Sequence, residues 1–262
     1  MKSLNIAATG MLAQQRNVEV ISNNIANLNT VGYKRQRAEF QDLLYQTLER
    51  PGALSAANGT VVPNGVQIGA GVKTGSVYRI TEQGNVTATG NDLDLAISGR
   101  GFFQVLLPDN TEAYTRAGNL AVSADGRIVT EDGYEVLPGI TIPEDAVDVS
   151  ISEGGIVEVR ITGEQNLREL GTFELVTFFN ESGLEAIGDN LLLQTTASGE
   201  PERGTAGEDG FGRILQGFIE TSNVDPVQEI TSLIAAQRAY EMNARVIETS
   251  DEMLATNANL RG

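Results

Sequence analysis

Apolar and small residues recur at alternating spacings of three and four positions at both ends of this chain, and this feature constrains the fold most. Such spacing places side chains along one line of an α-helix, as in the heptad seam of coiled coils. Gln14 fills the one missing step of the N-terminal series, which comprises Leu4, Ala7, Met11, Val18, Ile21, Ile25 and Leu28. We therefore expect a long N-terminal helix that ends within the polar, glycine-containing segment 27–32.

The second series follows Pro226, a residue that the first turn of a helix tolerates. Asn223 and Asp225 are both suitable caps for this helix. We expect Val227, Ile230 and Ile234 to widen its apolar stripe. The seam itself comprises Leu233, Ala236, Tyr240, Asn243, Ile247, Ser250 and Leu254.

Two arrangements of these helices are open. Each helix packs separately on the rest of the protein, or the two pair in a coiled coil that stands apart from it. A heptad seam is narrower than the stripe of most core-facing helices, which favours pairing. Because Gln14 and Asn243 are polar and other seam residues are small, a lone pair would be weak, and we expect many copies to pack together.

Between the two ends, short apolar runs alternate with turn signals. The runs predict strands at 77–80, 93–97, 102–107, 128–130 and 157–161, with turns at 125–126, 132–133 and 154–155. Alternation predicts a further strand that places Phe173, Leu175, Thr177 and Phe179 on one side. The expected fold is therefore mixed α and β, with a discontinuous coiled-coil domain (1–45 and 222–262), an extended arm (46–75) and a β-rich body (76–221).

Two segments show neither the helical spacing of three and four positions nor the alternation of a strand. Residues 46–70 are mostly small and polar, and Arg50, Pro51, Gly52 and Pro63 suit an extended arm. The glycine-rich stretch 199–212 is interpreted as a plain linker.

The chain of 262 residues has no Cys and no His. This excludes Ser-His-Asp and Cys-His catalysis and all Cys/His structural zinc sites. The net charge is −17, of which residues 1–50 carry +2 and residues 222–262 carry −3, so the middle carries −16. An acidic surface repels nucleic acids and anionic membranes, and we expect neither as a partner.

The N-terminus does not have the pattern of a secretory signal, because polar residues from Asn5 to Arg16 interrupt its apolar stretch. No apolar run reaches the roughly 18 residues of a membrane-spanning helix. We expect a cytosolic protein, or one exported with its N-terminus intact.

Three motifs that suggest chemistry are weak. Asp92 and Asp94 would share one face of a strand, but pairs of this kind arise by chance among 35 acidic residues. The segment 99–101 contains two glycines without the full phosphate-loop fingerprint, and a turn between strands is expected there. The basic run 34–37 is too short to indicate nucleic-acid binding beside an acidic body. We expect no catalytic site, metal site or cofactor.

One segment is more specific. Residues 26–34 (ANLNTVGYK) predict a helix end and then a tight turn, in which Gly32 permits a positive φ. With the preceding Ser22-Asn23-Asn24-Ile25, this segment resembles the N-terminal signature of the bacterial flagellar rod and hook family, carried here by Asn27, Thr30, Gly32, Tyr33 and Lys34. Segments 220–224 and 237–241 resemble the family's C-terminal signature. Motifs at 67–72, 83–85, 101–105, 113–118 and 183–190 are similar to the branch that builds the distal rod.

The resemblance implies a structural subunit of a rigid, hollow helical tube that transmits motor torque to the hook. It implies that the terminal helices line an inner layer, and that residues 46–70 bridge and stiffen neighbouring subunits. The implied partners are further copies of the chain, proximal rod subunits, hook subunits and surrounding ring proteins. The implied location is the basal body across the periplasm and outer membrane, reached by type III export.

Three other functions remain open. Another rod or hook subunit is the nearest, although length and residues 46–70 argue against the hook protein. A secreted β-rich tail-tip or binding module is disfavoured by the heptad seams at both ends. An enzyme acting through carboxylates ranks last.

Overall fold

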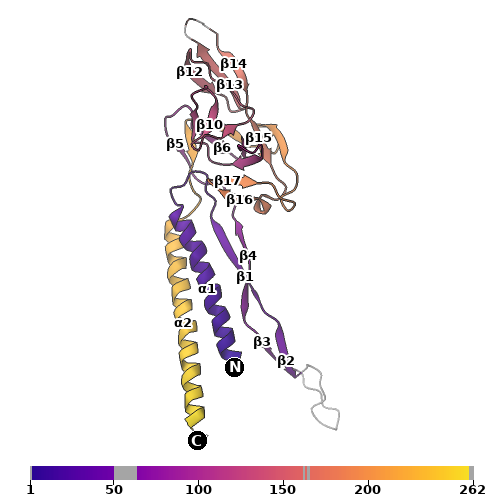
Figure 1. Cartoon of the computed structure of the whole chain (residues 1–262), viewed down its shortest axis with the longest axis vertical. Coiled ribbons are helices and arrows are strands. Elements are labelled where there is room, and N and C mark those ends of the chain that lie inside the picture. Colours follow the sequence, from indigo (N-terminus) through magenta and orange to yellow (C-terminus); the bar gives the residue numbers. More distant parts are fainter. Residues whose placement is uncertain (1, 50–63, 162, 164–165, 260–262) are drawn as a thin grey trace. The chain divides into compact units, whose positions relative to one another are not determined.

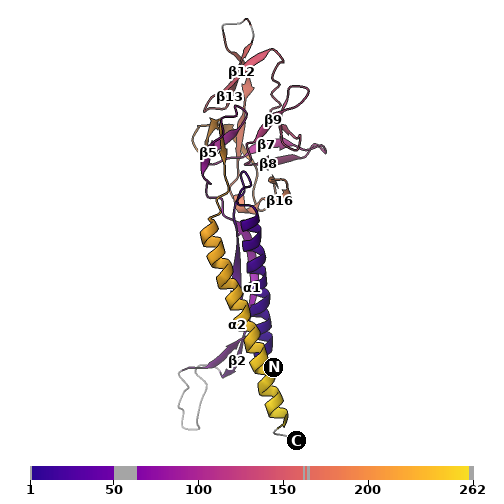
Figure 2. The same ribbon diagram turned by 90° about the vertical axis from the view of Figure 1, so that its left-hand side faces the viewer.

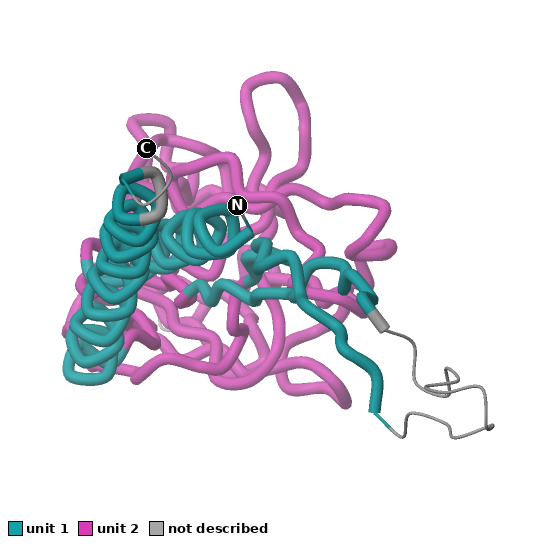
Figure 3. Tube along the Cα trace, turned by 90° about the horizontal axis from the view of Figure 1, so that it is seen from below, with its two compact units in different colours: residues 1–25, 36–78, 225–262 teal, residues 26–35, 79–224 magenta. Residues whose placement is uncertain are grey.

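The computed structural model describes residues 2–49, 64–161, 163 and 166–259. It divides into two compact units, drawn in different colours in Figure 3. Unit 1 comprises residues 1–25, 36–78 and 225–262, and unit 2 comprises residues 26–35 and 79–224. Residues 26–35, expected in the terminal helical domain, thus cluster with the β-rich unit, whereas most of the expected arm clusters with the helices.

Unit 1 contains two long helices and a β-ribbon (Figure 1). The helices are α1 (Lys2–Ala26) and α2 (Pro226–Asn259). The ribbon pairs β1 (Gln36–Asp42) with β4 (Val72–Arg79), and β2 (Tyr45–Glu49) with β3 (Val66–Gly69). The stiffening-arm residues Arg50, Pro51, Gly52 and Pro63 lie outside the described residues.

Local turn and capping residues set the C-terminal end of α1 and the N-terminal end of α2. α1 stops at Ala26, so Leu28 lies in the following turn, and Gly32 adopts a φ of +69°. Asp225 caps α2, because its carboxylate accepts the backbone N–H groups of Val227 at 2.9 Å and Gln228 at 3.3 Å.

The two helices lie side by side in Figures 1 and 2. They approach closely at Gly10, where a Cβ atom would lie 2.9 Å from the Asn243 amide nitrogen. Asn24 donates a hydrogen bond of 3.2 Å to Glu229 and exchanges two of 2.8 Å with the backbone of Gln36, which joins α1 to α2 and to β1. A groove of about 590 Å³ is lined by both helices, including Val18 and Tyr240. These contacts do not establish a knobs-into-holes coiled coil, and that pairing stays a prediction.

The side of α2 opposite to its predicted seam differs from expectation. Val227, Ile230 and Ile234 do not widen a packed stripe but are 73, 50 and 45% exposed. Seam residues Ala236 and Ser250 are buried. At 3.6 residues per turn the three exposed side chains lie away from the buried ones, so α2 is apolar on two faces.

The described residues of unit 2 form a β structure of five sheets. A seven-stranded sheet has the order β16-β17-β8-β7-β11-β10-β9, and β12-β13-β14 form a three-stranded sheet. Three two-stranded sheets join β15 to β18, β19 to β6 and β20 to β5. The strands are β5 (Val86–Ala88), β6 (Leu95–Ser98), β7 (Phe103–Leu106), β8 (Glu112–Thr115), β9 (Leu120–Val122), β10 (Ile128–Thr130), β11 (Glu135–Val136), β12 (Ala146–Ile151), β13 (Ile156–Ile161), β14 (Arg168–Thr172), β15 (Glu174–Thr177), β16 (Glu185–Gly188), β17 (Leu191–Leu193), β18 (Glu202–Thr205), β19 (Arg213–Gln216) and β20 (Phe218–Glu220), and a short 3₁₀ helix η1 spans Glu181–Gly183.

Three apolar cores stabilise the described part of unit 2, the smallest of which contains Val105, Ala113 and Leu191. Of the other two, the larger core contains Phe103, Phe173 and Leu175, and the second contains Phe102, Val176 and Phe178. Leu175 and Val176 of β15 therefore point into different cores, so this strand is buried on both faces. In β7 the consecutive residues Phe103, Gln104 and Val105 are all buried as well. The predicted strands at 77–80, 93–97, 102–107, 128–130 and 157–161 are confirmed in overlapping positions, as are the turns at Gly126, Gly133 and Gly155, which have positive φ values.

Two sequence interpretations in unit 2 are wrong. The alternation predicted for 173–179 fails, because Val176 and Phe178 are buried whereas Phe179 is 98% exposed and follows the strand. The stretch 199–212 is not a linker, because β18 lies within it and pairs with β15 from Glu174↔Thr205 to Thr177↔Glu202.

Removing a buried side chain of β15 should therefore be costly. We expect Leu175→Ala to lower the free energy of unfolding by about 2–5 kcal/mol, because it opens a cavity in the larger core. Val147→Ala, at a side chain that is 70% exposed, should change it by less than about 0.5 kcal/mol. Urea unfolding followed by circular dichroism measures both, and equal effects would contradict this account of the core.

Candidate functional site: the Glu220 cluster

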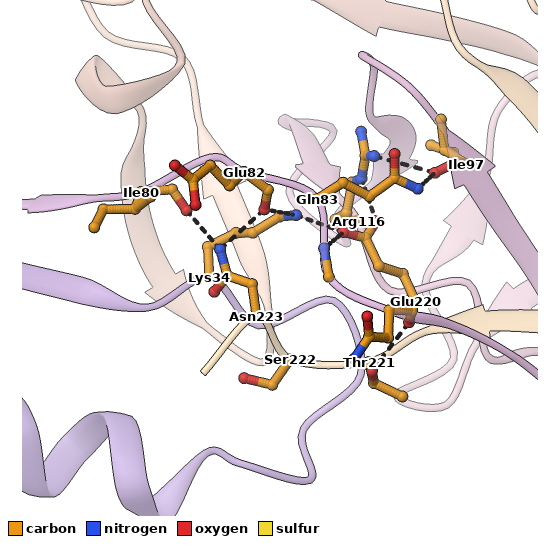
Figure 4. Close-up of polar contacts among 12 residues, drawn as sticks. Lys34, Ile80, Glu82, Gln83, Ile97, Arg116, Glu220, Thr221, Ser222 and Asn223 are labelled. Carbon is orange, nitrogen blue, oxygen red and sulfur yellow. Dashed lines mark hydrogen bonds and ion pairs between the residues drawn. The ribbon is translucent and has the colours of Figure 1, made fainter. Parts of the chain in front are cut away.

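The carboxylate of Glu220 lies at the end of β20 with no exposed surface. Its Oε1 accepts hydrogen bonds from Lys34 Nζ at 2.5 Å and from the Gly84 backbone N–H at 2.8 Å. Its Oε2 accepts one from Arg116 Nε at 2.6 Å. We call these three charged residues, Lys34, Arg116 and Glu220, the Glu220 cluster (Figure 4).

Backbone carbonyl groups complete the coordination of both cations. The Arg116 guanidinium donates to the carbonyl oxygens of Gly101 at 2.6 Å, Gly99 at 2.5 Å and Ile97 at 3.1 Å. Lys34 Nζ also donates to the Glu82 carbonyl at 2.8 Å. The glycine-containing turn at 99–101 therefore presents carbonyl oxygens to a cation, which is the opposite of a phosphate-binding loop.

The backbone around the cluster joins three separate segments of the chain. The Gly32 N–H donates to the Glu220 carbonyl at 2.8 Å, and the Arg35 N–H donates to Asn223 Oδ1 at 2.7 Å. The Asn223 amide in turn donates to the carbonyls of Ile80 at 3.0 Å and Glu82 at 2.9 Å. Residues 32–35, 80–84 and 220–223 are thus bound to one another (Figure 4).

Two glycines permit this close approach. At Gly32 a Cβ atom would lie 2.7 Å from the Ala117 nitrogen, and the φ of +69° disfavours any other residue. At Gly84 a Cβ atom would lie 1.9 Å from the Thr221 carbonyl oxygen.

The charges of the cluster are strongly coupled. Burial alone would raise the pKa of Glu220, but Arg116 and Lys34 outweigh it through charge and hydrogen bonds and hold the pKa below its ordinary value of 4.5. Burial lowers the pKa of Lys34, an effect that the carboxylate of Glu220 partly offsets. The cluster therefore carries a buried carboxylate that stays ionised because two cations face it.

The cluster is suited to holding segments together rather than to catalysis, because its carboxylate is saturated by donors and has no exposed surface for a substrate. It was not predicted as a set. The sequence singled out Lys34 in the N-terminal signature, whereas Arg116 and Glu220 stood in separate motifs with no indication that they meet.

The other signature residues lie near the end of α1. Thr30 Oγ1 donates to Asn27 Oδ1 at 3.0 Å, and Tyr33 is partly buried. Thr30 and Tyr33 belong to the turn that precedes Lys34, in which the Tyr33 N–H donates a hydrogen bond of 3.3 Å to the Thr30 carbonyl.

The predicted seam residues are distributed over unit 1. Ile21 is buried and Tyr240 is 40% exposed. Partly buried seam residues are Leu4, Met11, Val18, Ile25, Leu233, Ile247 and Leu254.

The acidic pair at 92 and 94 has a local role. Asp94 accepts hydrogen bonds from Thr89 Oγ1 at 2.5 Å and from Asn91 Nδ2 at 2.9 Å, which close a loop. Within the described ranges, no group of three or more His, Cys, Asp or Glu side chains is arranged to hold a metal ion.

Comparison with known proteins decides the family. Residues 4–34 match the model of flagella basal body rod proteins, residues 96–159 match the flagellar hook protein FlgE/F/G D1 domain, and residues 215–260 match the flagellar basal body rod FlgEFG protein C-terminal region. A flagellar basal-body rod protein FlgG from Caulobacter vibrioides is 60% identical over 261 residues, covering 100% of both chains. This chain belongs to the flagellar basal-body rod protein family. It is a structural rod subunit and not an enzyme.

Two further relatives have the same overall length. The FlgG protein of Agrobacterium fabrum is 53% identical over 97% of both chains. The FlgF rod protein of Caulobacter vibrioides is 34% identical over 96% of this chain and 94% of its own. Among the described residues of this rod subunit, no helix is both long enough and apolar enough to cross a membrane.

Two residues of the Glu220 cluster, Lys34 and Glu220, lie within the two terminal regions that match the family models. The N-terminal match ends at residue 34, and the C-terminal match contains Glu220. The ion pair of 2.5 Å therefore joins the two terminal family regions of the rod subunit across 186 positions of sequence.

Glu220→Gln should destabilise unit 2 by about 3–5 kcal/mol at pH 7, because two buried cations lose their counter-charge. The folded pKa of Glu220 is depressed, so the stability it contributes is present above 4.5 and is lost as pH falls through the folded value. The difference between wild type and variant should therefore shrink below pH 4.5. Thermal unfolding from pH 3 to pH 8 measures it.

Glu153→Gln is the matched control, since the pair of Glu153 and Arg213 is 3.1 Å long and both side chains are 66% exposed. An exposed pair contributes about 0–1 kcal/mol. If both variants behaved alike at neutral pH, the buried carboxylate would not have the role assigned to it.

Proposed function

We propose that this chain builds the distal part of the rod as a rigid, hollow helical homopolymer that transmits motor torque to the hook. The distal assignment is supported by a comparison of sequence identities to two rod proteins of one organism, Caulobacter vibrioides. This chain is 60% identical to its FlgG protein but 34% identical to its FlgF protein. A hook subunit and a secreted tail-tip module are accordingly less well supported.

The second apolar face of α2 carries the polymerisation argument. It consists of Val227, Ile230 and Ile234 near the start of the helix. Farther along α2, Met242, Val246 and Met253 are 62, 44 and 65% exposed and, at 3.6 residues per turn, lie on a flank between this face and the seam. A helix that is apolar on opposite faces is normally buried on both, and contiguous exposed apolar surface marks an interaction site. Nothing among the described residues of the chain covers this face, so its natural partners are helices of neighbouring copies.

We propose that the terminal helices pair through their seams and form the inner layer of the tube, with unit 2 outside. The groove between α1 and α2 and the close approach of Gly10 to the Asn243 side chain support a pairing that is weak in one chain and completed by neighbours. Each copy then offers one surface to a different surface of the next, which propagates as a helix.

The remaining partners and the location follow from the same assignment. Proximal rod subunits, hook subunits and surrounding ring proteins would contact the tube at its ends and along its outer side. We place the rod across the periplasm and outer membrane, and we propose export by the flagellar type III apparatus with the N-terminus retained. Residues 46–75 would act as the arm that bridges subunits.

Charges on the exposed face of α2 should prevent assembly. We expect Ile230→Glu with Ile234→Glu to leave the monomer folded and to abolish filaments in electron micrographs of concentrated protein, because two charges would be buried unpaired. Ile230→Leu with Ile234→Leu preserves the apolar face and should still assemble. Normal filaments from the charged variant would exclude this face from the subunit contacts.

Shortening the arm should soften the polymer. We expect deletion of residues 51–62 to preserve assembly through the helices and to lower the persistence length of filaments measured in electron micrographs. Replacement of the same segment by a Gly/Ser sequence of equal length separates length from chemistry. An unchanged persistence length in the deletion variant would reject the stiffening role.

A further inference from the structure

Phe179 is a large apolar side chain that unit 2 leaves almost wholly in solvent. It is 98% exposed, whereas the preceding Phe178 is 1% exposed and packs on Phe102 and Tyr114. Phenylalanine is among the residues most often buried in folded proteins, so a fully displayed ring is informative.

The backbone on both sides of this ring is fixed. The Phe178 carbonyl accepts a hydrogen bond of 3.2 Å from Arg100 Nη2. The Asn180 N–H donates to the Ser198 carbonyl at 3.2 Å, and the Asn180 amide donates to the Ala197 carbonyl at 2.9 Å. Ordering this ring on binding therefore costs little beyond its own two side-chain torsions, which is the property of a binding anchor.

The charge of unit 2 restricts what the ring can bind. Unit 2 holds ten basic and 25 acidic side chains, a net charge of −15, whereas unit 1 holds eight basic and ten acidic ones, a net charge of −2. Two copies of unit 2 repel each other, so a receiving surface is favoured on unit 1.

Unit 1 has a groove lined by both apolar and charged side chains. The groove, of about 360 Å³, lies between α1 and β4 and is lined by Leu12, Ala13 and Val72, by Thr9, Gln15 and Thr74, and by the charged residues Arg16, Glu19 and Lys73. Arg16 and Glu19 form an ion pair of 3.1 Å, which leaves Lys73 as the cation whose charge is not offset there. This volume is in the lower part of the range of about 300–1,000 Å³ that suits compact ligand groups. Leu12 is 63% exposed in it, and Lys73 is exposed without an ion pair among the described residues.

We infer that Phe179 of one copy inserts into the groove between α1 and β4 of a neighbouring copy. The contact joins two different surfaces and so propagates rather than closes. The acidic unit 2 that displays the ring then faces Lys73, the cation of the groove that has no ion pair among the described residues. This inference rests on the proposed polymer and names a subunit contact that involves neither the exposed face of α2 nor the arm.

Cross-linking tests the contact directly, because the natural chain has no Cys. Phe179→Cys and Leu12→Cys proteins, mixed in equal amounts, assembled and then oxidised, should give disulfide-linked pairs that contain one of each chain. Each protein alone, and a mixture of Val147→Cys with Leu12→Cys, should give only background. Cross-linking of the Phe179 and Leu12 mixture at background level in assembled filaments overturns the inference.

The energetic test uses Phe179→Ala and Lys73→Glu. Phe179→Ala should raise the critical concentration for assembly about tenfold or more and leave the thermal midpoint of the monomer unchanged, because the ring is already in solvent. Lys73→Glu should also raise it, more strongly at low salt than at high salt. If wild type forms filaments and Phe179→Ala forms them equally well, the inference fails and the proposed function stands. If wild type forms no filaments at any concentration, both fail.

Discussion

The buried carboxylate of Glu220 is the constraint on which the arrangement of unit 2 depends. A carboxylate with no exposed surface must be compensated by cations and hydrogen bonds, or it would be expelled or protonated. Its two cations lie 186 and 104 positions earlier in the sequence, at Lys34 and Arg116. The segment that follows α1, the middle of the β unit and the segment that precedes α2 are therefore held at one place.

The same constraint joins the two segments of unit 2 that lie next to the terminal helices in the sequence. Residues 32–35 and 220–223 are bound to each other in unit 2, and each leads within a few residues to a terminal helix. The segment after α1 and the segment before α2 are therefore joined, and within unit 1 the Asn24–Glu229 hydrogen bond and the close approach of Gly10 to Asn243 hold the two helices together. Glycine is required at positions 32 and 84, because a side chain at Gly84 would clash with the Thr221 carbonyl and one at Gly32 with the backbone of Arg116 and Ala117.

The sequence foretold the parts of the fold that depend on near neighbours along the chain. Helices at both ends, the turns at Gly126, Gly133 and Gly155, and several strands follow from local period and turn chemistry. The pairing of Glu220 with Lys34 and Arg116 does not follow from them, because periodicity contains no information about partners more than 100 positions away.

The alternation expected for β15 was wrong because a period of two assumes one buried face, and this strand has a core on each side. The strand β18 was missed because Glu202 and Gly204 have little strand propensity of their own, and the segment pairs because β15 lies beside it.

Unit 2 is stable as a single copy, whereas unit 1 carries the surfaces suited to association with other copies. The described part of unit 2 buries three apolar cores and a saturated ion cluster, so its stability does not require another chain. Unit 1 leaves α2 apolar on two faces and holds its helices through small and polar contacts, so its burial is incomplete in one copy. The distribution of charge acts in the same direction. A net charge of −15 on unit 2 opposes contacts between β units over the Debye length of about 8 Å at physiological salt, whereas the nearly neutral unit 1 faces little such opposition. Apolar burial can therefore direct assembly through the helical unit, and the charged unit suppresses association in other orientations.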